Sequence, residues 1–270
     1  MSATDKIERE SAGMNLLLLE PHEVTASGAV RLTGRRAAHL VEVLKVVPGS
    51  TVRCGIVNGP RGQGTVLGIS DGLVSIDCEF DGSPDASGDR PPLDLLLGLP
   101  RPKVMKRLWA QLAALGVGHI VLTNASRVER PYFDTHVLQP DVYRPLLLEG
   151  LQQARDTRVP QVSVHRQFRA LVEDHLAAMF PSGLRLVADP SSPASPHDVV
   201  RTRLGDRSGA SATPARCLIA VGPEGGWNAF ETTLLNAHGF ISVGMGPRTL
   251  RSDTACIALL AIVRDALGRS

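Results

Sequence analysis

Two glycine-rich turns near the carboxyl end decide the fold of this chain. Gly222-Pro223-Glu224-Gly225-Gly226-Trp227 follows the apolar run Cys217–Val221, and Gly244-Met245-Gly246-Pro247-Arg248-Thr249-Leu250-Arg251-Ser252-Asp253-Thr254-Ala255 follows Phe240–Val243. Each segment predicts a short buried strand, a turn and then a helix. Glycine lets a ligand approach the bare backbone, and the free N–H groups of such turns can bind it. The pair therefore predicts a ligand site on two neighbouring strands.

Strand-like and helix-like segments alternate upstream of these turns. This alternation predicts an α/β domain with a mainly parallel sheet. The Ser/Pro-rich stretch Pro190–Ala215 predicts a long loop, and the last helix, Asp253–Leu267, is apolar nearly all round and is expected to be buried. The other expected elements are strands at Leu93–Leu99, His119–Thr123, Gln161–Val164 and Leu184–Ala188, and helices at Lys103–Leu115, Asp141–Ala154 and Arg169–Met179.

The first third of the chain has a different pattern, in which short strand-like runs are separated by Gly, Pro and Asn turns. One helix candidate, Ala37–Val46, interrupts them, and the whole predicts a small β-barrel. Residues 81–92 have the composition of a linker. Residues 1–13 are polar and predict a disordered extension, with Met14 as an alternative start. The expected strands are Leu16–Glu20, Ala29–Leu32, Thr51–Val57, Gly64–Ile69 and Val74–Phe80.

Composition narrows the class of protein. The 270 residues are 43% hydrophobic and 21% charged, which suits one large folded domain or two ordinary ones. The apolar runs are too short to span a bilayer, and no secretion signal follows Met1, so we expect a cytoplasmic protein with no membrane partner. The four cysteines are widely scattered without metal-ligand spacing, which argues against a metal site, iron–sulfur chemistry and a zinc ribbon.

The charge distribution permits a nucleic-acid partner. The net charge is +2, and the isoelectric point is near 8.5. Between residues 101 and 130 basic side chains outnumber the single acid, Glu129, which suits a polyanion, although a solvated helix face would have the same composition. The basic residues of this stretch are Arg101, Lys103, Lys106, Arg107, Arg127 and Arg130.

Together, the two turns resemble the C-terminal signature of the 16S ribosomal RNA uridine-N3 methyltransferases, a branch of the SPOUT superfamily. The resemblance covers roughly residues 14–268 and is strongest at the carboxyl end. It implies a PUA-like RNA-binding barrel over residues 14–80, a SPOUT domain with a deep trefoil knot over residues 93–270, and a homodimer. Only the resemblance implies the knot, because chains normally avoid threading through loops.

The resemblance also implies the cofactor, S-adenosylmethionine, and no metal. No G-x-G-x-x-G follows a first strand and no P-loop lysine is present, which argues against dinucleotide and P-loop enzymes. The residues expected to hold the cofactor are Asp189, Gly222, Pro223, Gly225, Gly226, Met245, Gly246 and Leu250.

The implied reaction assigns three candidate catalytic residues. The N3 of uracil carries a proton, so methylation requires its loss and stabilisation of the resulting anion. Arg248 and Arg251 can stabilise that charge, although helix capping or a structural ion pair would also account for them. Glu224 is the nearest carboxylate to act as base or to orient the uracil, but an unshifted glutamate is a poor base, and hydrogen bonding in the turn is its alternative role. Asp253 stands where the family more often has glutamate; this shorter acid would orient Arg251 less well, or would cap the last helix.

N3 lies on the Watson–Crick edge, so the target uridine must be single-stranded or flipped out. Departures from the family pattern at Ala114, Gln152 and Asp156 leave the RNA target open. One alternative is a SPOUT methyltransferase that acts on another RNA position, and another is a catalytically inactive RNA-binding protein. Lys45 replaces the usual arginine and keeps its charge without the bidentate geometry. The residues expected to contact phosphates of 16S rRNA in the small subunit are Lys45, Lys103, Lys106, Arg127 and Arg155.

Overall fold

The computed structural model describes residues 15–81, 92–204 and 216–268. The predictions for residues 1–13, for Met14 and for most of the linker lie outside these described residues. The chain divides into two compact units, Met1–Asp89 with Leu148–Val159, and Arg90–Leu147 with Pro160–Ser270. The sequence analysis placed Leu148–Val159 in the second domain. This segment groups with the first unit because its backbone is hydrogen-bonded there, for example from Leu16 N to Gln152 O at 3.0 Å.

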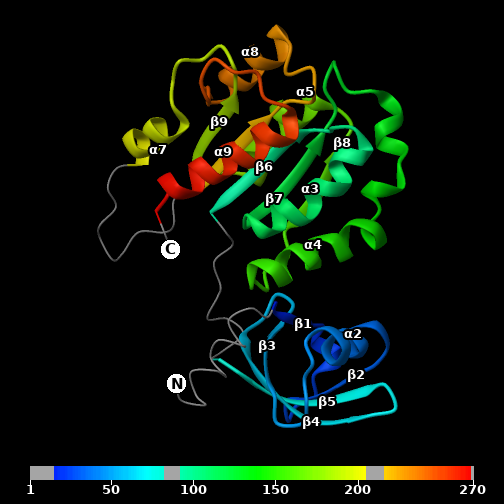
Figure 1. The fold of residues 1–270 in the computed structure, drawn as a ribbon. Coiled ribbons are helices and arrows are strands. Elements are labelled where there is room, and N and C mark those ends of the chain that lie inside the picture. Colours follow the sequence, from blue (N-terminus) through cyan, green and yellow to red (C-terminus); the bar gives the residue numbers. More distant parts are fainter. Residues whose placement is uncertain (1–14, 82–91, 205–215, 269–270) are drawn as a thin grey trace. The chain divides into compact units, whose positions relative to one another are not determined.

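The first unit contains a curled five-stranded sheet (Figure 1) in the order β1-β3-β4-β5-β2. β1 and β3 are parallel, and the other pairs are antiparallel. Buried and exposed residues alternate along much of β4 and β5, because residues two apart share a face of a strand, and the buried face forms the core. The bounds are β1 Leu17–Leu19, β2 Ala29–Leu32, β3 Thr51–Ile56, β4 Arg61–Ser70 and β5 Leu73–Phe80, with a short helical turn, η1, at Pro21–Glu23.

The helix of this unit ends earlier than the sequence predicted. α2, Gly34–Ala38, continues into a wider helical turn, η2, His39–Val43, whereas the expected helix was Ala37–Val46. Lys45 has a φ of 54°, in the left-handed region. A left-handed residue turns the chain out of a helix, so the helix ends before Val46.

The second unit contains a parallel six-stranded sheet in the order β11-β9-β10-β6-β7-β8 (Figure 1). β6, β7 and β10 are buried throughout, which is the pattern of strands covered on both faces. The predicted α/β class with a mainly parallel sheet is therefore confirmed. The bounds are β6 Leu93–Gly98, β7 Val117–Thr123, β8 Gln161–His165, β9 Leu184–Ala188, β10 Cys217–Val221 and β11 Phe240–Val243.

One helix lies where the sequence predicted a long loop. α7, Pro196–Leu204, begins with proline at its first position, where proline is tolerated. It packs against α9, and its Val200 is buried. The Ser/Pro composition therefore missed this helix, and the part of the predicted loop at residues 205–215 lies outside the described residues. The other helical segments are α3 Pro102–Ala114, η4 Arg130–Asp134, η5 His136–Leu138, α4 Pro140–Ala154, α5 Phe168–Ala170, η6 Leu171–His175, α6 Leu176–Met179, α8 Ala229–Ala237 and α9 Ser252–Ala266.

The last helix, α9, buries one face. Leu259 and Val263 are fully buried, whereas Ile257 and Ile262 are half-exposed. Burial raises the pKa of the Cys256 thiol in this helix to about 12, which makes it unreactive at neutral pH. Among the described residues, no helix is long and apolar enough to cross a membrane, and no three His, Cys, Asp or Glu side chains are grouped to hold a metal ion.

Candidate functional site

The predicted ligand loops of the second unit leave the same edge of the parallel sheet. The two glycine turns were predicted on neighbouring strands, and this is wrong, because β9 lies between β10 and β11 and is paired with both. The register of β9 pairs Val187 with Ala220 and Ala188 with Val243. The segments that begin at Asp189, Gly222 and Gly244 therefore follow the carboxyl ends of three adjacent strands. In open α/β sheets, ligands bind in the crevice outside these strand ends.

The first glycine loop is folded too tightly for side chains at its key positions. A Cβ on Gly222 would lie 2.9 Å from the backbone nitrogen of Trp227, and one on Gly98 would lie 2.6 Å from Cδ of Pro223. Gly226 has a φ of 71°, and its N–H donates to the Pro223 carbonyl at 2.7 Å. The loop therefore depends on glycine for both its close packing and its left-handed turn.

The second glycine loop begins against the segment that follows β9. A Cβ on Gly244 would lie 2.1 Å from the carbonyl oxygen of Ser192, and Asp189 N donates to Val243 O at 3.0 Å. The Asp189 carboxylate accepts hydrogen bonds from the backbone N–H and hydroxyl of Ser191, at 2.9 and 2.6 Å. The Asp189 side chain thus stabilises its own turn, and the segment after β9 is hydrogen-bonded to the end of β11.

The rest of the second loop leaves its backbone accessible. Gly246 has a φ of 92°, and a Cβ built on it would meet no heavy atom within 4 Å. Met245 is half-buried, whereas Arg248 and Leu250 are exposed. Bare backbone next to open space is what a ligand needs to reach N–H and C=O groups, so this loop suits a bound cofactor.

Two predicted residues fasten the first loop to neighbouring loops. The Arg127 guanidinium, on the loop after β7, donates to the carbonyl of Gly225. The exposed Glu224 accepts a hydrogen bond from the backbone N–H of Arg101, at the start of α3, at 2.9 Å. Arg127 and Glu224 were predicted for RNA binding and catalysis, and in this structure both make contacts that position the loop.

A buried carboxylate that the sequence analysis did not select connects these loops. Glu231 is 3% exposed, and its two oxygens accept the backbone N–H groups of Ser126 at 2.6 Å and Asn228 at 2.8 Å. The Asn228 side chain accepts the Glu231 N–H in return, which completes a capping box at the start of α8. The sequence signal was available, since Asn228 is followed three residues later by glutamate.

The predicted catalytic Arg251 lies beside an ion pair at the start of α9. Asp253 pairs with Arg107 of α3 at 2.9 Å, and its other oxygen lies 3.6 Å from Nε of Arg251. The Arg251 side chain is 74% exposed, so it can reach a ligand. Arg107 was noted only as part of the basic stretch, because no local pattern indicates a partner so distant in sequence.

The five residues predicted to bind RNA are divided between the two units. Lys103, Lys106 and Arg127 belong to the second unit, and all three are exposed. Lys45 and Arg155 belong to the first unit, where both are exposed and adopt left-handed backbone angles.

Comparisons with known proteins identify the family. A family model described as an RNA methyltransferase domain matches residues 88–264. Ribosomal RNA small subunit methyltransferase E of Treponema pallidum is 31% identical over 93% of this chain and 90% of that protein. The chain belongs to the ribosomal RNA small subunit methyltransferase E family. The family predicted from the two glycine turns is therefore confirmed.

Two other members of the methyltransferase E family match over nearly their full length. Ribosomal RNA small subunit methyltransferase E 1 of Borreliella burgdorferi is 24% identical over 94% of this chain and 99% of that protein. The crystal structure of the Neisseria gonorrhoeae methyltransferase E, bound to S-adenosyl methionine, superposes with a TM-score of 0.69. That match has 20% identity and covers 93% of this chain and 97% of that chain, so the fold is shared.

Proposed function

We propose that this family member transfers a methyl group from S-adenosylmethionine to N3 of a uridine in 16S ribosomal RNA of the small subunit. The observation that carries the proposal is the pair of glycine loops, which flank β9 at the carboxyl edge of the sheet. Family membership supports methyl transfer to ribosomal RNA. The resemblance of the two turns adds the 16S rRNA and the N3 position.

The cofactor would be held mainly by backbone groups. The open main chain at Gly246 would provide N–H and C=O groups for adenine and ribose. The left-handed turn at Gly226 would provide carbonyl groups, because its own N–H is bonded to Pro223. Because the Asp189 carboxylate is hydrogen-bonded within its own turn, we assign its contribution to neighbouring main-chain groups. When bound, the cofactor supplies an activated methyl group. The proposed set is Asp189, Gly222, Pro223, Gly225, Gly226, Met245, Gly246 and Leu250.

The protein must stabilise the uracil anion that forms when N3 loses its proton. Arg248 and Arg251 are exposed on the second loop, where their guanidinium groups can donate to the carbonyl oxygens of uracil. Asp253, near Nε of Arg251, restricts where that side chain points. Glu224 would orient the base or accept its proton, while its bond to the Arg101 N–H fixes the loop.

The remaining architecture follows the same family resemblance. We propose a PUA-like barrel over residues 14–80, a linker over residues 81–92, and a SPOUT domain with a trefoil knot over residues 93–270. A homodimer would cover the half-exposed Ile257 and Ile262 of α9, which gives these apolar side chains a partner. Because small-subunit ribosomal RNA is the proposed substrate, we place the protein in the cytoplasm.

Nucleoside mass spectrometry of small-subunit ribosomal RNA tests the function. In cells that lack the gene, 3-methyluridine is expected to disappear and to return when the gene is restored. Restoration with an Arg251→Ala variant should not return it, whereas a variant of the exposed Arg169 should. Persistence of 3-methyluridine in the deletion would refute the N3 assignment, and loss of a different methylated nucleoside would identify another RNA position.

A further inference from the structure

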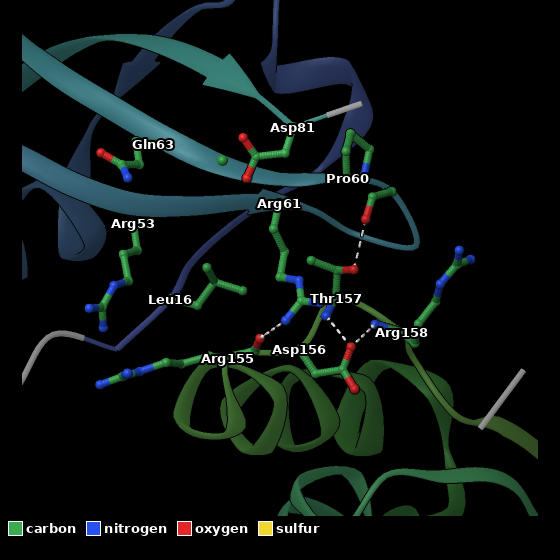
Figure 2. A pocket seen from close by; sticks show the side chains of 12 residues that line it. Leu16, Arg53, Pro60, Arg61, Gln63, Asp81, Arg155, Asp156, Thr157 and Arg158 are labelled. Atoms are coloured by element: carbon green, nitrogen blue, oxygen red, sulfur yellow. Dashed lines mark hydrogen bonds between the residues drawn. The ribbon is translucent and has the colours of Figure 1, made fainter. Parts of the chain in front are cut away.

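A cavity of about 480 Å³ opens in the first unit, lined by β3, β4 and the segment that follows α4 (Figure 2). Ligand pockets of this kind commonly have volumes of about 300–1,000 Å³. Its lining carries more positive than negative charge. The charged lining residues are Arg53, Arg61, Arg155, Arg158, Asp81 and Asp156.

The segment that closes the cavity is fixed to the strands by hydrogen bonds. Thr157 is 4% exposed, its hydroxyl donates to Gly59 O at 2.7 Å, and its carbonyl accepts the Asn58 N–H at 2.8 Å. Asp156 Oδ1 accepts the backbone N–H groups of Thr157 and Arg158, at 2.7 and 3.2 Å. The wall is therefore ordered, and the Asp156 carboxylate is engaged by its own main chain.

Main-chain carbonyls hold two of the arginines. Arg61 Nη1 donates to the carbonyl of Arg155 at 3.4 Å, and Arg158 Nη1 donates to that of Asn58 at 3.3 Å. A carbonyl partner orients a guanidinium without neutralising its charge. The bond of Arg61 therefore leaves the positive charge of that guanidinium at the cavity wall for an anion.

Arg53 provides an independent sign of a ligand. Its Nη1 is buried and has no hydrogen-bond partner among the described residues. A buried donor without a partner loses its bonds to water without replacement, which destabilises the folded state, and more so for a charged group. In Figure 2, the Arg53 and Arg155 side chains extend to the same side of Leu16. A ligand oxygen in this cavity would satisfy the Arg53 donor.

We infer that this cavity binds a phosphodiester group of the single-stranded RNA substrate. That the ligand belongs to RNA rests on the proposed function, and that it is a phosphate rests on the chemistry of the cavity. A guanidinium presents paired N–H donors that match two phosphate oxygens. Several arginines that line one cavity therefore favour an anion that offers two oxygens over a neutral ligand. The contact positions RNA on the first unit without reading its sequence.

Fluorescence anisotropy with a labelled single-stranded RNA oligonucleotide tests this on the full chain, over a range of salt concentrations. Arg53→Gln and Arg155→Gln remove one cavity charge each. Arg31→Gln is the matched control, because Arg31 is an exposed arginine on β2 of the same unit and does not line the cavity. Each cavity variant should weaken binding several-fold and reduce the slope of log K against log salt by about 0.7, while the control should do neither.

Equal affinity and salt slope for wild type and both cavity variants would overturn the inference. Competition with inorganic phosphate distinguishes the ligand source. If the variants lose phosphate binding while RNA binding is unchanged, the cavity serves a small phosphorylated ligand and the RNA assignment is wrong. Thermal melts show whether each variant folds; Arg155 is exposed, so its variant decides the question if Arg53→Gln does not fold.

Methyl transfer is measured separately, with S-adenosylmethionine and small-subunit ribosomal RNA. If wild type transfers no methyl group but the cavity variants still lose RNA affinity, the proposed reaction fails and the phosphate site stands. If methyl transfer occurs and the cavity variants bind RNA as wild type does, the reaction stands and the site fails.

Discussion

Glu231→Gln provides a local test of how the first glycine loop is held. The wild-type carboxylate is 3% exposed and accepts the N–H groups of Ser126 and Asn228. Glutamine has nearly the same shape but keeps only one acceptor oxygen, and its NH₂ group faces the second donor. One of the two backbone N–H groups therefore loses its partner in a partly buried position.

The magnitude follows from these two bonds. A hydrogen bond to a charged group stabilises the folded state by about 1.5–3 kcal/mol, so the substitution should weaken local structure by about that amount. Because about 1.4 kcal/mol is a tenfold change in an equilibrium constant, the protection of one amide against hydrogen exchange should fall by about 10- to 150-fold. The loop that carries Arg127 would then open more often, which would loosen its bond to the Gly225 carbonyl.

Hydrogen exchange resolved at single amides is the assay. Glu173→Gln is the matched control, because Glu173 forms an exposed pair with Arg169 four residues earlier, and such pairs contribute little. The control should leave both amides unchanged. Wild-type protection at both Ser126 and Asn228 in Glu231→Gln would show that the buried carboxylate does not hold these loops, and the reasoning would be refuted.

Three further substitutions test other parts of the second unit. Gly98→Ala should lower the free energy of unfolding, measured with urea, by about 1–3 kcal/mol, because the added Cβ would lie 2.6 Å from Pro223. The same substitution should weaken S-adenosylmethionine binding measured by calorimetry, and unchanged values in both assays would contradict this prediction. Arg251→Ala should lower turnover more than cofactor affinity, and an equal loss of both would indicate a scaffold role. Burial, and to a smaller extent the nearby His175, lowers the pKa of His165. The neutral His165 side chain therefore contributes stability above the unfolded pKa of about 6.5, and this contribution is lost as the pH falls below that value. His165→Gln should therefore show a smaller fall in melting temperature below that pH than wild type, and an identical pH profile would exclude the role.

The sequence determined the parts of this protein that short-range patterns encode. Apolar runs of strand length and alternating helices gave the parallel sheet, because strand and helix periodicity depends on residues close together. The two glycine turns indicated the family and the loops for which we propose a ligand site. Close packing at Gly222 and the left-handed angle at Gly226 require glycine there. The capping box of Glu231 was also local, although it was missed.

The tertiary structure decided which distant residues act together. The pairing of Arg107 with Asp253, and the bond from Arg127 to the carbonyl of Gly225, join positions about a hundred or more residues apart. The same holds for the cavity in the first unit, where Arg155 joins Arg53 only because the segment after α4 is hydrogen-bonded to that unit. The periodic patterns of a sequence do not indicate such contacts. The contacts depend on how whole helices and strands pack, and on which buried donors and acceptors that packing brings within hydrogen-bonding distance.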